Sequence, residues 1–419
     1  MAELRVPGVS VWVLAGGAED GFQLGITSVD NPLAVDEDTV FQAGSITKTL
    51  TATAALRLAQ RGVLDLDAPV RRSLPALRLA DEDVAAAITM RDLLSHGGGF
   101  VGDWFDDFGW GDNAVAEYVE GIQRLPQLTP LRAVWSYNNA GFVLAGHVLE
   151  VVAEKPYEDV IRDDVLDDAL FFPWDVMLQR FVAGHVTENE TVRVAEPWAV
   201  SRSAAPAGGL VASTRTLVEY ARMHLEDERL TAMREPILQS QPDEWMGLAW
   251  FLTERNGVGF AQHGGTTNGQ CALLSLAPER GFVLAVLANH RHGHALIKRV
   301  VERALEGILG LEPWQPELVD LSSERLAEYA GRYEMPLSVI ELRVEDGVLV
   351  LEWIPKGGFP KPDSPPHPAP PPARVAFHDE DGFHVTEGVM KGQRGQVLRG
   401  EGGRIAWVRF GLRIHAPVS

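Results

Sequence analysis

Apolar residues recur along this chain at two different periods, and each period predicts a different kind of element. Near the beginning, Val9, Val11 and Val13 fall on one face of an extended segment. A glycine-containing turn then leads into a second alternating segment around residues 22–27. A period of two is typical of β-strands, so the chain is predicted to open with two antiparallel strands.

From Ser45 onward the period lengthens to that of a helix. Leu50, Ala54 and Leu58 recur every four residues, and Gly62 follows as a suitable C-terminal cap. Similar spacing predicts five further helices. They are Val84–Ser95, Ala114–Leu125, Ala140–Ala153, Leu217–His224 and a helix from about His294 to Leu309.

Strand patterns return before the last of these helices. They cover Gly247–Leu252, Cys271–Ala277 and Phe282–Ala288. Strands at both ends of a segment, with helices between them, indicate an α+β fold in which helices flank an antiparallel sheet. We therefore predict one such domain over residues 1–311.

The remaining chain has a purely β pattern. Residues 312–324, with prolines, charges and serines, are predicted to form a linker. In the segment that follows, Asp346-Gly347 is a strong signal for a type I′ hairpin, whereas the proline-rich 361–372 should form an exposed polyproline-like loop. Residues 325–419 are predicted to form a small antiparallel, barrel-like domain.

Charge and cysteine content narrow the class of protein. The chain has 37 Lys and Arg against 58 Asp and Glu, a formal net charge of −21, which argues against nucleic acid and anionic membranes as partners. The single Cys271 cannot form an internal disulfide. No apolar run approaches the roughly 20 residues needed to span a bilayer. The first residues lack a signal-peptide pattern, so we expect a cytoplasmic protein unless a leader has been removed.

Ser45 and Lys48 are the first candidates for chemistry. They lie at the start of the predicted helix, where residues i and i+3 share a face. A hydroxyl needs an adjacent base to become a good nucleophile, and a desolvated lysine can provide one. The alternative is that Ser45 only caps the helix and Lys48 is a surface charge.

Tyr137 and Asn139 form a second candidate group. A tyrosine beside an ammonium can relay a proton, and an asparagine amide can hold both a lysine and a substrate carbonyl. The alternative is an ordinary helix start with an Asn cap and a packed Tyr.

The third group is His263-Gly264-Gly265-Thr266, expected at the start of a late strand. Two glycines would let a substrate lie against the strand edge, and the Thr266 N–H could share an oxyanion hole with that of Ser45. The alternative is a β-bulge with a satisfied histidine.

In this order the three groups resemble the motifs of the penicillin-recognising serine hydrolases. The resemblance is strongest to the class C β-lactamase-like branch, which includes D-aminopeptidases, D,D-peptidases and esterases. Further segments share it: Ile88–Gly99, Pro206–Arg222, the late strand that ends at Asn289 and, in the predicted β domain, Tyr329–Glu334.

The resemblance implies a role for each group. Ser45 would be the nucleophile, Lys48 and Tyr137 would handle its proton, and Asn139 would orient lysine and substrate. His263, Gly264 and Gly265 match the third motif, where β-lactamases carry a lysine. Because histidine is largely neutral at pH 7, efficient β-lactam hydrolysis is doubtful.

The resemblance therefore favours a serine hydrolase that acts on small peptides with D-residues, as a peptidase or amidase, without metal or organic cofactor. The alternatives are a carboxylesterase, a weak β-lactamase and a non-catalytic penicillin-binding sensor. The expected partner is a small molecule or short peptide, and the oligomeric state stays open. A further hypothesis is that protonated His263 binds a substrate carboxylate.

Other polar residues carry weaker signals. His290, His292 and His294 lack a carboxylate or thiolate at ligand spacing, so a metal site is not expected there. His96 is expected to cap or pack, and Arg202 to lie at the surface.

Overall fold

The computed structural model describes residues 1–313, 315 and 317–418. The predicted linker 312–324 includes positions 314 and 316, and the predicted C-terminal domain ends at 419; these three positions lie outside the described residues. The chain forms two compact units. The first comprises Met1–Gly102, Asp106–Gln239 and Asp243–Pro313; the second comprises Asp103–Phe105, Ser240–Pro242 and the chain after Pro313.

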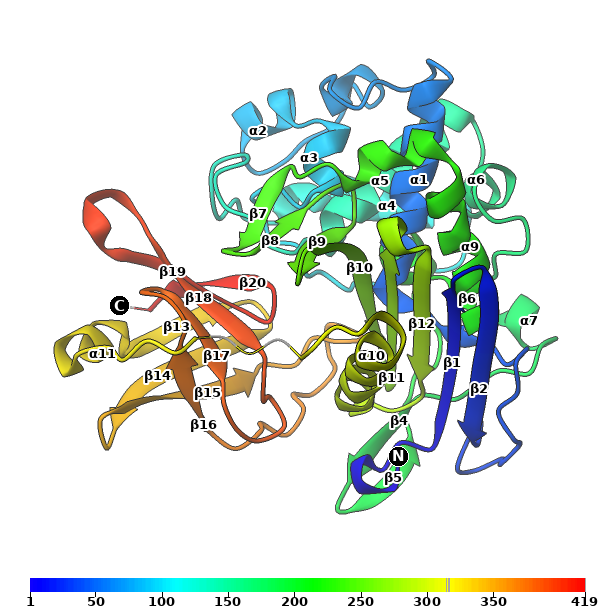
Figure 1. Ribbon diagram of the computed structural model, residues 1–419. Helices are drawn as coiled ribbons and strands as arrows, with labels where there is room; N and C mark the ends of the chain where they lie inside the picture. The colour runs from blue at the N-terminus through cyan, green and yellow to red at the C-terminus, as the bar shows by residue number, and fades with distance from the viewer. Residues whose placement is uncertain (314, 316, 419) are drawn as a thin grey trace. The chain divides into compact units, whose positions relative to one another are not determined.

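An eight-stranded antiparallel sheet runs through the first unit (Figure 1). From one edge to the other its strands are β2 (Ala18–Gly25), β1 (Gly8–Ala15), β12 (Phe282–Ala288), β11 (Gln270–Ala277), β10 (Val258–Thr267), β9 (Phe251–Arg255), β8 (Glu244–Met246) and β7 (Leu238–Gln241). Strands from the two ends of this unit's chain thus lie side by side near one edge of the sheet, where β1 pairs with β12.

The alternation seen in the sequence directs side chains to the two faces of this sheet. Val9 and Val11 join an apolar cluster with Ile297 and other residues of α10 (Gly293–Leu309). Ser10, between them, faces the other way and its hydroxyl lies 2.8 Å from that of Thr214 at the start of α9 (Thr214–Glu226). Helices therefore cover both faces, and every residue of β12 is buried.

The unit also contains α1 (Thr47–Gln60), which contacts α5, α6 and α8, and further helices. They are α2 (Glu82–Ala87), α3 (Met90–Leu94), α4 (Ala114–Gly121), α5 (Asn139–Ala153), α6 (Tyr157–Asp164), α7 (Pro173–Val176) and α8 (Ala205–Gly208). Two short strand pairs complete the unit: β3 (Phe41–Gln42) with β6 (Val211–Ala212), and β4 (His185–Glu188) with β5 (Thr191–Val194). The predicted antiparallel sheet flanked by helices is confirmed.

Two predicted elements differ from the structure by more than a few residues at one end. The segment 84–95 is not one helix, because Thr89 is extended and starts α3 with a reciprocal capping box to Asp92. The predicted strand 247–252 is also wrong. β8 ends at Met246 and β9 begins at Phe251, with Ala249 between them in a left-handed conformation (φ 62°).

The second unit contains a closed antiparallel barrel, which confirms the barrel-like prediction for the C-terminal fold. Its strands are β13 (Gly331–Met335), β14 (Ser338–Glu345), β15 (Val348–Pro355), β16 (Ala373–Phe377), β17 (Gly382–Val385), β18 (Arg394–Arg399), β19 (Ile405–Phe410) and β20 (Arg413–Pro417). The helix α11 (Ser323–Tyr329) precedes them, and its Tyr329 packs with Phe377, Phe383 and Phe410 in the barrel core.

Candidate active site

Ser45 lies where β3 ends and the chain turns into a helix. Residues Gly44–Ile46 form one turn of 3-10 helix that continues directly into α1. Gly44 has φ 54°, a left-handed conformation that glycine adopts without a steric penalty. The tight turn sets the Ser45 side chain one helical turn before Lys48, as the spacing predicted.

Lys48 is fully buried, which contradicts the surface alternative. Its ammonium nitrogen Nζ lies 3.1 Å from Ser45 Oγ, 2.8 Å from Asn139 Oδ1 and 2.5 Å from the backbone carbonyl oxygen of Ala207. A buried ammonium group is costly unless it is hydrogen-bonded, and these three oxygens provide that compensation. The structure thus brings Ser45, from the turn before α1, together with Lys48 of α1 and Asn139 of α5.

The start of α5 places Asn139 and Tyr137 on either side of a helix cap. Asn138 is the N-cap, and its side chain accepts a hydrogen bond from Gly141 N–H. Asn139 is the first helical residue and faces Lys48. The Tyr137 ring is also near this lysine, with its centre 4.9 Å from Nζ. The side chains predicted from two distant motifs therefore meet around one amine.

His263 lies in the second half of β10, not at the start of a strand as expected. Its ring is 1% exposed, and its Nδ1 lies 2.6 Å from the Gly264 carbonyl oxygen. A carbonyl can only accept, so Nδ1 carries the hydrogen and Nε2 is left as an acceptor. Burial, with a further contribution from the charge of Lys48, lowers the pKa of His263 to about 3. The ring is therefore neutral at pH 7, which removes the cation assumed in the carboxylate hypothesis.

The two glycines of the third motif have different surroundings. A Cβ on Gly265 would lie 2.0 Å from the Ala43 carbonyl oxygen, whereas one on Gly264 would meet nothing closer than 3.7 Å. A Cβ on Gly44 would likewise lie 2.8 Å from the Thr266 backbone nitrogen. The turn before Ser45 and strand β10 thus approach so closely that only glycine fits at Gly44 and Gly265.

The Ala207 carbonyl is a part of the site that the sequence analysis missed. It comes from the short helix α8, within the segment Pro206–Arg222 that carried the family resemblance. Because the contact to Lys48 is made by a backbone carbonyl, no side chain in the sequence could indicate this position.

The weaker candidates have structural partners. His290 Nε2 lies 3.1 Å from Thr187 Oγ1, and His294 Nε2 lies 2.7 Å from Thr266 Oγ1. Across the described residues, no group of three His, Cys, Asp or Glu side chains could hold a metal ion. Arg202 is buried against Glu158, so the predicted surface position was wrong.

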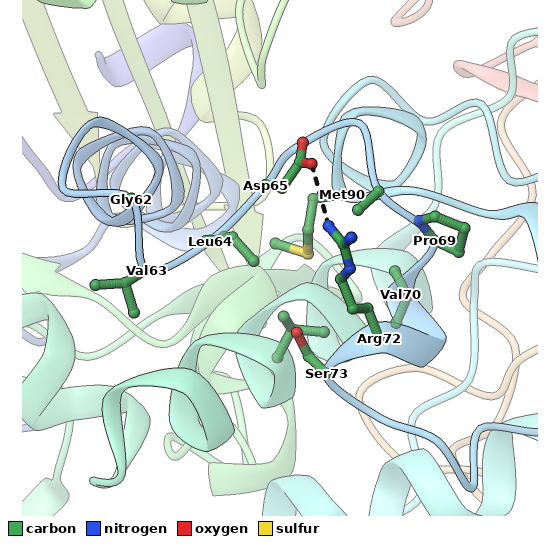
Figure 2. Close-up of a pocket in the computed structure, with 11 residues that line it drawn as sticks. Gly62, Val63, Leu64, Asp65, Pro69, Val70, Arg72, Ser73 and Met90 are labelled. Atoms are coloured by element: carbon green, nitrogen blue, oxygen red, sulfur yellow. Dashed lines mark hydrogen bonds and ion pairs between the residues drawn. The ribbon is translucent and has the colours of Figure 1, made fainter.

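A cavity of about 190 Å³ lies at the far end of α1 from Ser45 (Figure 2). It is lined by Gly62, Val63, Leu64, Asp65, Ala68, Pro69, Val70, Arg72, Ser73, Met90 and Val148. Its rim carries an ion pair between Arg72 and Asp65, whose nearest atoms are 3.5 Å apart. None of the eight predicted site residues lines it.

Within the described part of the chain, no helix has both the length and the apolar character that a membrane crossing requires. The candidate site itself combines a hydroxyl, an amine and a phenol at one point. This arrangement can transfer a proton from the hydroxyl and so activate it as a nucleophile.

Comparison with known families places the first unit among described proteins. The family described as Beta-lactamase matches residues 1–306. Penicillin-binding protein 4 of Amycolatopsis lactamdurans is 30% identical over 363 residues, which cover 79% of this chain and 94% of that protein.

Two further proteins show shorter or structural similarity. Esterase EstB of Burkholderia gladioli is 49% identical over 136 residues, or 29% of this chain and 34% of the esterase. The crystal structure of SurE is 25% identical and has a TM-score of 0.76; the match covers 100% of this chain and 96% of that one. A second SurE structure, determined with D-Leu, has a TM-score of 0.74 at the same identity and coverage.

Proposed function

This chain belongs to the Beta-lactamase family, and we propose that it is a serine hydrolase that cleaves amide or ester bonds through an acyl-enzyme on Ser45. The observation that carries the proposal is the 3.1 Å distance between Ser45 Oγ and the buried Lys48 Nζ. In its neutral form Lys48 donates to Asn139 Oδ1 and the Ala207 carbonyl, and its lone pair can accept the hydroxyl proton without any movement of the backbone. As an ammonium it would instead favour Tyr137 as the group that accepts this proton.

In the acylation step, Ser45 Oγ attacks the substrate carbonyl carbon while its proton passes to the group formed by Lys48 and Tyr137. The C–N or C–O bond of the tetrahedral intermediate then breaks, and the leaving amine or alcohol takes up that proton. Water attacks the resulting ester of Ser45, the acid is released, and the serine regains a proton. Asn139 keeps the Lys48 amine directed at Oγ through its 2.8 Å hydrogen bond.

The negative charge that develops on the carbonyl oxygen needs donors placed in advance. We assign this role to the backbone N–H groups of Ser45 and Thr266. The close approach of Gly44 and Gly265 to the opposite segment supports this assignment, because it brings the backbones of the turn and of β10 together.

Within this reaction class, we propose a small peptide or amide containing a D-residue as the substrate. The neutral His263 supports this choice, since the strand lacks the lysine with which β-lactamases hold the antibiotic carboxylate. The similar SurE was determined with D-Leu, a ligand of the same stereochemistry. Carboxylester hydrolysis is the second candidate, and the 136 residues shared with esterase EstB favour it.

Turnover of two chromogenic substrates tests the proposal. D-alanyl-p-nitroanilide reports amide cleavage and p-nitrophenyl acetate reports ester cleavage, and L-alanyl-p-nitroanilide serves as the stereochemical control. We expect the D-amide to be cleaved faster than the L-amide and Ser45→Ala to abolish both enzymatic activities. Full activity in a folded Ser45→Ala variant would contradict the proposal, and turnover of the ester alone would select the esterase.

A further inference from the structure

His96 adopts a backbone conformation that residues with a side chain rarely adopt. Its φ is 62°, in the left-handed region, although Gly97, Gly98 and Gly99 follow it directly. The side chain is 1% exposed, so the ring is held inside the unit. In a buried residue other than glycine this conformation persists where the surrounding contacts hold it, so the contacts of the His96 side chain show what keeps it there.

The ring accepts a hydrogen bond from the segment that carries two of the proposed site residues. Asn138 N–H donates to His96 Nδ1 over 3.0 Å. Because Asn138 is the N-cap of α5, the helix itself offers this N–H no acceptor, and its burial makes a partner necessary. Asn138 lies between Tyr137 and Asn139 in the chain. The hydrogen bond to His96 Nδ1 therefore fixes the backbone between these two site residues.

The same ring packs directly against the Tyr137 ring. Their centres are 4.3 Å apart and their planes are inclined by 31°, while Trp135 and Phe142 surround the imidazole at 5.7 and 5.0 Å. Lys48 Nζ lies over the Tyr137 and Phe142 rings. His96 therefore supports Tyr137 through its ring and through the neighbouring backbone.

We propose that His96 is a positioning residue for Tyr137, which it holds in place for proton transfer through the hydrogen bond from Asn138 N–H and the contact between the two rings. The inference rests on the proposed function, since Tyr137 must handle the Ser45 proton for its position to matter. The role assigns to His96 no contact with the substrate, so its loss should lower kcat far more than it changes KM.

Two substitutions separate the acceptor from the backbone conformation. In His96→Asn, the acceptor Oδ1 is bonded to Cγ, as Nδ1 is in histidine, so it can take the place of that nitrogen. Asparagine also tolerates the left-handed region. His96→Gly also tolerates that region but has no acceptor. We expect His96→Gly to lose about 100-fold in kcat with KM within threefold of the original, and His96→Asn to keep kcat within about tenfold.

A matched control and a second contrast complete the experiment. His224 is another buried histidine, 1% exposed, that contacts Tyr220 and Trp250 away from Tyr137, so His224→Asn should leave kcat within threefold. If His96→Gly does not fold, His96→Gln replaces it, because its amide lies one carbon further out and lacks the acceptor position. The kcat of His96→Gln should then be at least tenfold lower than that of His96→Asn.

A folded His96→Gly with kcat within threefold of the original would overturn the inference. So would His96→Asn as slow as His96→Gly, or as His96→Gln where that variant is used, because the acceptor would then be irrelevant. The proposed function fails separately: it is contradicted by turnover in Ser45→Ala, whatever the His96 variants show.

Discussion

Two walls of the candidate site differ in how their polar groups are partnered. The helical wall consists of Ser45, Lys48, Asn139 and the Ala207 carbonyl; the strand wall is the stretch His263–Thr266 of β10. Lys48 and His263 are both buried beside Tyr137. Lys48 Nζ lies within 3.1 Å of three oxygens, whereas His263 Nε2 has no hydrogen-bond partner among the residues that the structure describes.

This difference indicates that the two walls have different roles in the proposed reaction. On the helical wall, short contacts link the groups that would move protons, so each should be indispensable for the chemical step. On the strand wall, the His263 ring is neutral, and the backbone of β10 supplies N–H donors. This wall therefore gives a substrate a surface and hydrogen bonds but no charge. The comparison predicts that helical-wall substitutions cost far more in kcat than strand-wall substitutions.

Lys48→Met should cause the largest loss in kcat among these substitutions. Methionine is close to lysine in length and keeps an apolar stem but removes the amine 3.1 Å from Ser45 Oγ. We expect kcat to fall by about 10³–10⁴-fold, within the range for loss of a positioned proton-transfer group. The control is Lys155→Met, which removes a lysine paired with Asp163 far along the chain and should leave kcat unchanged. Comparable kcat values for the two variants would contradict the predicted importance of the helical wall.

Tyr137→Phe should follow, with about a 10²-fold loss in kcat. The ring packing against His96 and Phe251 is kept, and only the phenol oxygen is removed. Tyr220→Phe is the matched control, because that buried hydroxyl bonds Thr53 and His224 outside the site. It should lower the unfolding midpoint without lowering kcat. If Tyr137→Phe keeps full activity, Lys48 alone handles the proton.

The strand wall is probed by two neighbouring glycines. Gly265→Ala would place a methyl group 2.0 Å from the Ala43 carbonyl oxygen, so β10 must move away from the turn before Ser45. We expect about a tenfold loss in kcat and about 1–3 kcal/mol of stability. Gly264→Ala has ordinary contacts and should change both quantities little. Steady-state kinetics and urea unfolding of the pair would show whether the close approach matters; equal effects would count against it.

The smallest expected effect concerns pH. Because burial lowers the pKa of His263 to about 3, the ring stays neutral from pH 5.5 to 8 and gains a proton only in strong acid. KM for a substrate with a carboxylate that does not titrate in this range should therefore be constant. A KM that rises with pH through the normal histidine range, near 6.5, would show that a protonated His263 binds the carboxylate after all.

The sequence predicted the fold and the helical wall well, because both follow from local rules. The four-residue period and the i, i+3 spacing placed Ser45 and Lys48 on one helix face, and the two-residue period placed Val9 and Val11 on one sheet face. The break at Thr89 was missed, since a capping box interrupts a helix without breaking its apolar pattern.

Features that depend on packing between residues far apart in the sequence could not be predicted. The neutrality of His263 results from burial beneath neighbouring rings, and the role of the Ala207 carbonyl has no side-chain signal. His96 was expected only to cap or pack. Its hydrogen bond from Asn138 joins segments 42 residues apart, which no local pattern contains.

Intact-protein mass spectrometry after incubation with a fluorophosphonate tests directly whether Ser45 is the nucleophile. We expect one adduct, mapped by peptide analysis to Ser45, and none in a folded Ser45→Ala variant. We also expect slow labelling of Lys48→Met, since the hydroxyl would lack its base. An adduct on another residue that accompanies loss of activity, or unlabelled Ser45 in an enzyme that turns over substrate, would contradict this role of Ser45.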